Sequence, residues 1–257
     1  MIYSKEPAMR RFILLLACAL RLSAASVRIY QTNSAGDAVD VIDPATNKVI
    51  MQVKDIEVPH GVAFSPDGKR AYISCEAEST LWSVDTKTGK LIAKAPLSGH
   101  PNNIAISKDG RRVFVAIVTQ PGAVDVIDTA AMKNIKTIAV KGGVHNTYVT
   151  PDGKVVLAGS IVGKMLTAID PNSLEILWEK PFDLGVRPIA FEKAPDGSTA
   201  PVHPAFRLQR VCGARFQDAR RGAADQESGR AFRRPHGRRS AIAWDHDRAR
   251  REDIVGG

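Results

Sequence analysis

Short apolar runs alternate with polar turns at a regular interval through residues 26–199. The runs are about five residues long and rich in Val, Ile, Tyr and Thr, as in Ala71–Cys75. Polar turns follow these runs. In the turns, Asp and Thr side chains can hydrogen-bond to nearby backbone groups, and Gly permits backbone angles that other residues avoid. Long amphipathic helical windows are missing from the same region. The pattern therefore predicts an all-β fold built from many short strands.

Two kinds of turn recur with the period of a repeat. One series of aspartates is spaced 42, 43 and 42 residues apart, at Asp43, Asp85, Asp128 and Asp170. The other series precedes glycine, at Asp67, Asp109, Asp152 and Asp196. In the second unit we predict strands over 71–75, 79–84, 91–95 and 103–107. Four strands in about 40–45 residues are typical of a propeller blade, so we expect four four-stranded blades of a β-propeller, followed by an irregular tail.

The repeat phrases I-Y-Q-T-N, V-D-V-I-D-P-A-T and H-G-V-A-F-S-P-D-G-K resemble the YVTN-type β-propeller repeat family. The resemblance covers residues 26–199, about two thirds of the chain. It implies an exported bacterial or archaeal propeller, related to surface-layer propellers and to the haem d1 domain of nitrite reductase. Members of that family usually have seven blades, whereas four repeats are legible in this chain.

The first 25 residues predict a signal peptide. Arg10 and Arg11 precede the apolar run Phe12–Leu20, and small residues end the segment at Ala25. Met9 is a better start than Met1, because Arg10 would then follow it directly. The run Leu15–Cys18 also resembles a lipobox, which leaves a lipid anchor at Cys18 as an alternative. The apolar run is too short to span a membrane, and no second run of spanning length exists, so we expect a periplasmic or extracellular protein.

The net charge of +9 is unevenly distributed. Residues 26–199 hold 19 basic and 19 acidic residues, so the repeat region carries no basic footprint for nucleic acid. Residues 200–257 hold 13 Arg, no Lys and 7 acidic residues, and their strand alternation is lost. A disordered basic tail is one interpretation of this segment.

A frameshift near residue 200 is the interpretation that we favour for the tail. Reading one base forward, Ile242–Gly256 becomes compatible with S-H-G-I-T-I-A-P-D-G-K-T-L-W-V, which is the repeat's own phrase. The glycine after the histidine is forced, because Trp244 has a single codon and the codon for Asp245 begins with G. Sequencing the gene across the codons for Asp196 to Pro201 distinguishes a broken frame from a genuine tail.

One aligned column holds the candidate site. It contains His60, Asn102, His145 and Arg187, each at the entry to the strand that precedes an Asp-Gly turn. A column repeated in every blade becomes a ring around the axis, and these side chains suit an anionic or metal-bearing ligand at an axial mouth. The alternative is that they bond neighbouring backbone and hold the blades in register. Within the column, Arg187 is the strongest binding candidate.

Other polar and aromatic positions point to structure. We expect both series of aspartates to make turns rather than catalyse. Trp82 and Trp178 should pack between blades, and His100 has no visible partner in the sequence. Cys75 is the one cysteine outside the two end segments, so neither an internal disulfide nor a metal site is expected there.

Two functional hypotheses remain open at this point. The first is an exported binding or scaffold module with a small anionic ligand or an unknown protein partner at the axial mouth. The second is a propeller enzyme or cofactor carrier, lactonase-like or associated with haem or quinoprotein systems, as the resemblance implies. No nucleophile, zinc or phosphate-loop motif occurs in the sequence, which favours a non-enzyme. The sequence specifies no cofactor.

Overall fold

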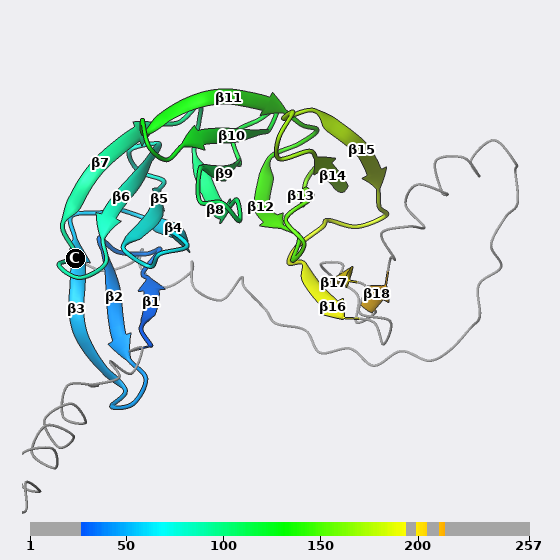
Figure 1. Ribbon diagram of the computed structural model, residues 1–257. Helices are drawn as coiled ribbons and strands as arrows, with labels where there is room; N and C mark the ends of the chain where they lie inside the picture. The colour runs from blue at the N-terminus through cyan, green and yellow to red at the C-terminus, as the bar shows by residue number, and fades with distance from the viewer. Residues whose placement is uncertain (1–26, 194–198, 205–210, 214–257) are drawn as a thin grey trace, which may run out of the picture. The chain divides into compact units, whose positions relative to one another are not determined.

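The computed structural model describes residues 27–193, 199–204 and 211–213. The chain divides into two units, Met1–Ala219 and Arg220–Gly257, and every described residue belongs to the first. The described secondary structure consists of β-strands in antiparallel sheets (Figure 1). No described helix is long and apolar enough to cross a membrane.

Three of the sheets have four strands. The second sheet holds β4 (Pro59–Phe64), β5 (Arg70–Cys75), β6 (Thr80–Asp85) and β7 (Leu91–Pro96). The third holds β8 (Pro101–Ile106), β9 (Arg112–Ile117), β10 (Ala123–Asp128) and β11 (Lys133–Ala139). The fourth holds β12 (Val144–Val149), β13 (Val156–Ser160), β14 (Met165–Ile169) and β15 (Ile176–Pro181).

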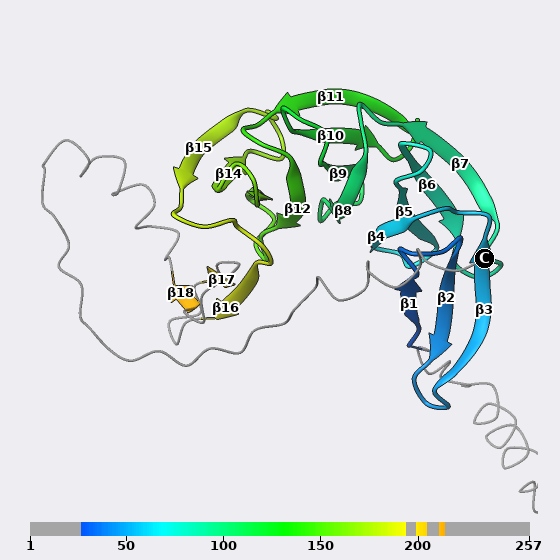
Figure 2. The same ribbon diagram turned by 180° about the vertical axis from the view of Figure 1, so that it is seen from behind.

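A three-stranded sheet lies at each end of this series. The first sheet contains β1 (Ile29–Thr32), β2 (Ala38–Asp43) and β3 (Lys48–Lys54), and the fifth contains β16 (Ala190–Lys193), β17 (Thr199–Pro204) and β18 (Val211–Gly213). Each sheet is a meander in which consecutive strands pair. The first strands of neighbouring sheets are in contact, β4 with β8 and β8 with β12. The last strands, β3, β7, β11 and β15, form the far edges of their sheets (Figures 1 and 2). The predicted all-β, partial propeller is confirmed.

The grouping of strands corrects one expectation. We expected the run 103–107 to complete the unit that begins at residue 71, with an outer strand starting after each Asp-Gly turn. Instead, the strand before that turn is the first strand of the next sheet, and the turn joins it to the second strand, as Phe64 pairs with Ala71 and Ile106 with Val113. A tight turn favours pairing of the two strands that it joins, so the Asp-Gly turn lies inside a blade.

The two series of aspartates make turns, as predicted. Asp85 Oδ1 accepts hydrogen bonds from Lys87 N at 3.1 Å, Thr88 N at 2.8 Å and Thr88 Oγ1 at 2.8 Å. Asp67 Oδ1 accepts from Ser65 Oγ at 2.6 Å and Lys69 N at 3.0 Å. The following glycine, Gly68, has a φ of 70°, which glycine adopts without strain. Asp196, the last of these aspartates, lies outside the described residues.

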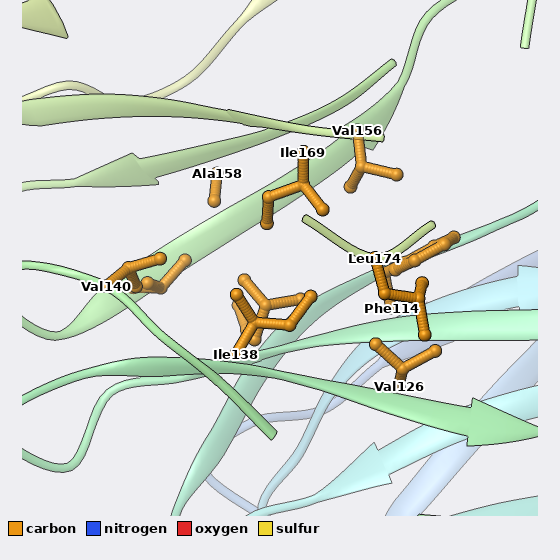
Figure 3. Close-up of a cluster of buried hydrophobic side chains, with 11 residues drawn as sticks. Phe114, Val126, Ile138, Val140, Val156, Ala158, Ile169 and Leu174 are labelled. Carbon is orange, nitrogen blue, oxygen red and sulfur yellow. The ribbon is translucent and has the colours of Figure 1, made fainter. Parts of the chain in front are cut away.

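Hydrophobic clusters join consecutive sheets. Between the third and fourth sheets, Phe114, Val126 and Ile138 pack against residues of β12, β13 and β14 (Figure 3). Between the first and second sheets, Trp82 packs with Val39 and other residues of both sheets. Trp82 is 4% exposed, so the prediction that it packs between blades is confirmed. Apolar contacts therefore hold neighbouring blades together.

The predicted end segments lie mostly outside the described residues. The signal peptide over 1–25 is outside them, as are 205–210 and 214–257 of the predicted irregular tail. The fifth sheet nevertheless extends into that tail, because β17 ends at Pro204 and β18 begins at Val211. Their registers place Val202 opposite both Ala190 and Gly213. The boundary near residue 200 and the broken reading frame stay predictions.

Candidate functional site

The structure places the candidate column at one end of the sheets. His60, Asn102 and His145 are each the second residue of the first strand of a sheet, in β4, β8 and β12. Arg187 occupies the corresponding position ahead of β16. Since β4 contacts β8 and β8 contacts β12, the column gathers where these strands begin. The Asp-Gly turns lie at the opposite end of the same strands.

A carboxylate that the sequence analysis missed binds the first histidine. Glu76 directly follows β5, whose last residue Cys75 pairs with Pro59 beside His60. Glu76 Oε2 and His60 Nε2 are in hydrogen-bond contact. The two side chains are 33% and 23% exposed, so solvent and small ligands can reach this pair.

His100 also lies next to Glu76, which corrects the expectation that it has no partner. Its Nδ1 is 3.8 Å from Glu76 Oε1, while the partner of His60 is the other carboxylate oxygen. Glu76 therefore stands between two imidazoles from consecutive sheets. Its counterparts in the other repeats are Ser34, Val118 and Ile161, so a single acid in this column was the available sequence signal.

The third and fourth members of the column make the other half of the site. Arg187 Nη1 lies 3.3 Å from His145 Nδ1. A guanidinium has only donors, so His145 Nδ1 must accept and the proton of the neutral ring must sit on Nε2. This tautomer is assigned from the contact. The arrangement leaves His145 Nε2–H and the other guanidinium N–H groups of Arg187 as donors for a ligand.

The surroundings keep His145 in its neutral form. Burial lowers the pKa of His145, and the positive charge of Arg187 lowers it further. His60 acts in the same direction, whereas the carboxylate of Glu76 raises the pKa. Charges from both halves of the site therefore act on His145.

Asn102 takes part through its backbone. Its carbonyl accepts the hydroxyl of Ser74 at 2.5 Å, just as the carbonyl of His60 accepts the hydroxyl of Thr32 at 2.8 Å. The first bond runs from β5 to β8 and the second from β1 to β4, so each joins one sheet to the next. Hydroxyl groups thus link the blades at this column, while the side chains of His60 and His145 contact other side chains. The role of the column in ligand binding stays a prediction.

Among the residues that the structure describes, no group of three or more His, Cys, Asp and Glu side chains is placed to hold a metal ion. Cys75 is buried with its Sγ 3.1 Å from the carbonyl oxygen of Glu57. Burial raises the pKa of this thiol, which keeps it protonated.

The lowered pKa of His145 predicts how pH acts on the protein. As pH falls from about 6.5, the unfolded chain protonates this histidine before the folded protein does. Above that pH, His145 therefore leaves the free energy of unfolding unchanged. As the pH drops from there through the lowered pKa of the folded state, protonation of this histidine in the unfolded chain lowers the free energy of unfolding. In Arg187→Gln we expect this pKa to rise towards its ordinary value, measured by NMR titration of the ring protons. Arg111→Gln, at the opposite end of the sheets, should leave it unchanged; an equal rise in both variants would contradict the assigned contact.

Comparison with known proteins supports the fold. No family model matches the chain, and no curated protein matches it. Among solved structures, the chain is similar to the Kuenenia stuttgartiensis hydrazine synthase, with a TM-score of 0.61 and 26% sequence identity. The match covers 73% of this chain and 55% of the other, so this chain spans little more than half the length of that structure.

Proposed function

We propose that the chain is an exported β-propeller module that binds a small anion at the axial mouth. The contact between Arg187 and His145 carries this proposal, because it joins two members of the column and leaves both with further N–H donors. Carboxylate and phosphate oxygens are the acceptors that such donors prefer. The neutral net charge of the repeat region adds no competing attraction for nucleic acid.

The half of the site that contains Glu76 and His60 is compatible with this preference for anions. Glu76 is already in contact with His60, so its negative charge is partly compensated where an anion would approach. The two halves together suit a ligand with an anionic group beside a hydrogen-bonding group that His100 or Glu76 can meet. Dicarboxylates and phosphates have this composition.

Titration with two probes tests the proposal. We expect succinate or inorganic phosphate to bind the full chain, as measured by calorimetry and by shifts of the His145 ring signals. Arg187→Gln should weaken binding about tenfold or more, since a hydrogen bond to a charged group contributes roughly 1.5–3 kcal/mol. Arg111→Gln is the matched control, because this arginine is 83% exposed in an Asp-Gly turn. Equal affinity of the wild type and of Arg187→Gln for these anions would contradict the proposed anion site.

Three further parts of the proposal come from the sequence. They are membership of the YVTN-type repeat family, export through the segment over 1–25, and truncation by a broken frame near residue 200. The repeat phrases, the apolar run after Arg11 and the arginine-rich composition after Thr199 support them in that order. A restored frame would return the protein to a longer propeller in which the same mouth is more fully enclosed.

An enzyme or cofactor carrier is the second candidate. The similarity to a hydrazine synthase favours it, because that protein is an enzyme by name. A chromophore that co-purifies with the frame-restored protein would support this candidate. A colourless protein that binds succinate or phosphate without turnover would support the binding module.

A further inference from the structure

In the described residues, the β1 edge of the first sheet has no paired strand, and we compare it with the equivalent edges of the second, third and fourth sheets. The pairing registers make β1 the counterpart of β5, β9 and β13, because each pairs in the same way with the following strand. The matched pairs are Ile29 with Ile42, Ala71 with Val84, Val113 with Ile127, and Val156 with Ile169. Counterparts across the four sheets can therefore be compared residue by residue.

In the described part of the chain, β1 lacks the partner that its counterparts have. β5, β9 and β13 each pair with a first strand, namely β4, β8 and β12, whereas β1 pairs only with β2. Ile29 is 47% exposed, although its counterparts Ala71, Val113 and Val156 are 0% exposed. The first sheet thus has an open strand edge and an exposed apolar residue where the other sheets are covered.

The third sheet shows how a covering segment is held. In the loop before β8, Ser98 donates its backbone N–H to Asp125 Oδ2 at 2.7 Å and its hydroxyl to Asp125 Oδ1 at 2.9 Å. Asp125 is 0% exposed and also accepts a hydrogen bond from Thr137 at 2.7 Å. The residues that follow form β8 and pair with β9. One continuous segment, from Ser98 to Ile106, therefore supplies both an anchor and a strand.

The first sheet has the receptor for the same anchor. Asp40 is the counterpart of Asp125, in the shared phrase A-V-D-V-I-D of β2 and β10. Within its own sheet, Asp40 accepts from Gln52 at 2.7 Å and from Asn33 at 3.1 Å. Each oxygen of Asp40 thus accepts one hydrogen bond, whereas Asp125 Oδ1 accepts two, so the carboxylate of Asp40 retains lone pairs for a further donor.

The pairing at another blade interface supports this complementarity. In the second sheet the counterpart of Asp125 is Trp82, and the counterpart of Ser98 in the preceding loop is Ile56. Ile56 and Trp82 are both buried in one hydrophobic cluster. In the second sheet an apolar loop residue therefore packs against an apolar strand residue. In the third sheet the hydroxyl of the loop residue bonds to the carboxylate of the strand residue. A carboxylate at position 40 consequently selects a hydrogen-bond donor in the covering loop.

We propose that the open side of the first sheet binds an extended segment of this repeat type from another chain. The segment donates a serine hydroxyl and backbone N–H to Asp40 and adds a fourth strand along β1, covering Ile29. Strand addition to an open edge obtains affinity from main-chain hydrogen bonds, while the anchor provides specificity. The inference is independent of the ligand at the axial mouth.

A labelled peptide with the sequence of residues 97–107 tests the proposal. We expect it to bind the full chain in fluorescence anisotropy and to slow hydrogen exchange of the β1 amides. Asp40→Ala in the protein, or Ser98→Ala in the peptide, should each weaken binding about tenfold. Combining both changes should add little to either alone, because they remove the same contact. Asp183→Ala, an exposed carboxylate outside the first sheet, is the matched control and should not alter binding.

Several results would overturn the proposal. They are a peptide that fails to bind, equal binding by Asp40→Ala and wild type, and additive effects of the two changes. Slow exchange of the β1 amides before the peptide is added, unchanged on dilution of the protein, would show that the edge is already covered by this chain itself. If Asp40→Ala failed to fold, the Ser98→Ala peptide would still decide the question on the wild-type protein.

Discussion

Phe114→Ala is expected to lower the free energy of unfolding by about 3–5 kcal/mol, which is the usual cost of removing a fully buried aromatic ring. Phe114 is 0% exposed in the middle of β9. Stabilities of natural domains are about 5–15 kcal/mol, so this loss would leave a large unfolded fraction at ambient temperature.

Phe114 lies where the third sheet meets the fourth. Its ring belongs to the cluster that joins the third sheet to Val156, Ile169 and Leu174 of the fourth (Figure 3). Its backbone carbonyl also accepts the hydroxyl of Thr147 from β12 at 2.9 Å. In a repeat array the interfaces between units hold the array together, so a cavity here should separate blades as well as weaken one.

Ile135→Ala provides the matched control for this prediction. Ile135 lies in β11 of the same sheet but is 49% exposed, so its truncation should cost less than about 1 kcal/mol. Urea unfolding monitored by circular dichroism measures both variants. Similar shifts of the midpoint in the two variants would show that the cluster around Phe114 does not hold the third and fourth sheets together.

Much of the fold could be predicted because each local rule recurs in every repeat. Asp85 bonds to Thr88 and Asp67 bonds to Ser65, so these turns are satisfied by neighbours two or three residues away and the sequence alone reveals them. The strand positions follow from the same periodicity. What periodicity cannot provide is an origin, since a repeat can be divided at any point. The Asp-Gly turn was therefore placed between blades instead of inside one.

The site was harder to predict than the fold. The column of His60 and Arg187 followed from alignment of the repeats, because every member occupies the same strand position. Glu76 belongs to another column and reaches His60 only through pairing of β4 with β5. The contact of Arg187 with His145 joins the segment ahead of β16 to β12, and it depends on the directions in which these two side chains point. Such contacts break the repeat, so the pattern that reveals the fold conceals them.

Asp125→Ala is the second variant with a large expected effect. The carboxylate of Asp125 accepts the backbone N–H and hydroxyl of Ser98 and the hydroxyl of Thr137. Removing it abolishes three hydrogen bonds to a fully buried carboxylate, and a hydrogen bond to a charged group contributes roughly 1.5–3 kcal/mol. We expect the free energy of unfolding to fall by about 3 kcal/mol or more in urea unfolding.

Asp40→Ala separates this effect from the loss of an aspartate in general. Asp40 occupies the same position in the first sheet, but its neighbours Gln52 and Asn33 can turn to water when the carboxylate is removed. Its expected cost is therefore about 1 kcal/mol or less. A covering segment bound to the first sheet should bring the cost of Asp40→Ala towards that of Asp125→Ala, because the anchor would then be buried. Equal costs for the two variants in the isolated chain would mean that Asp40 is already covered, and the open side of the first sheet would have to be abandoned.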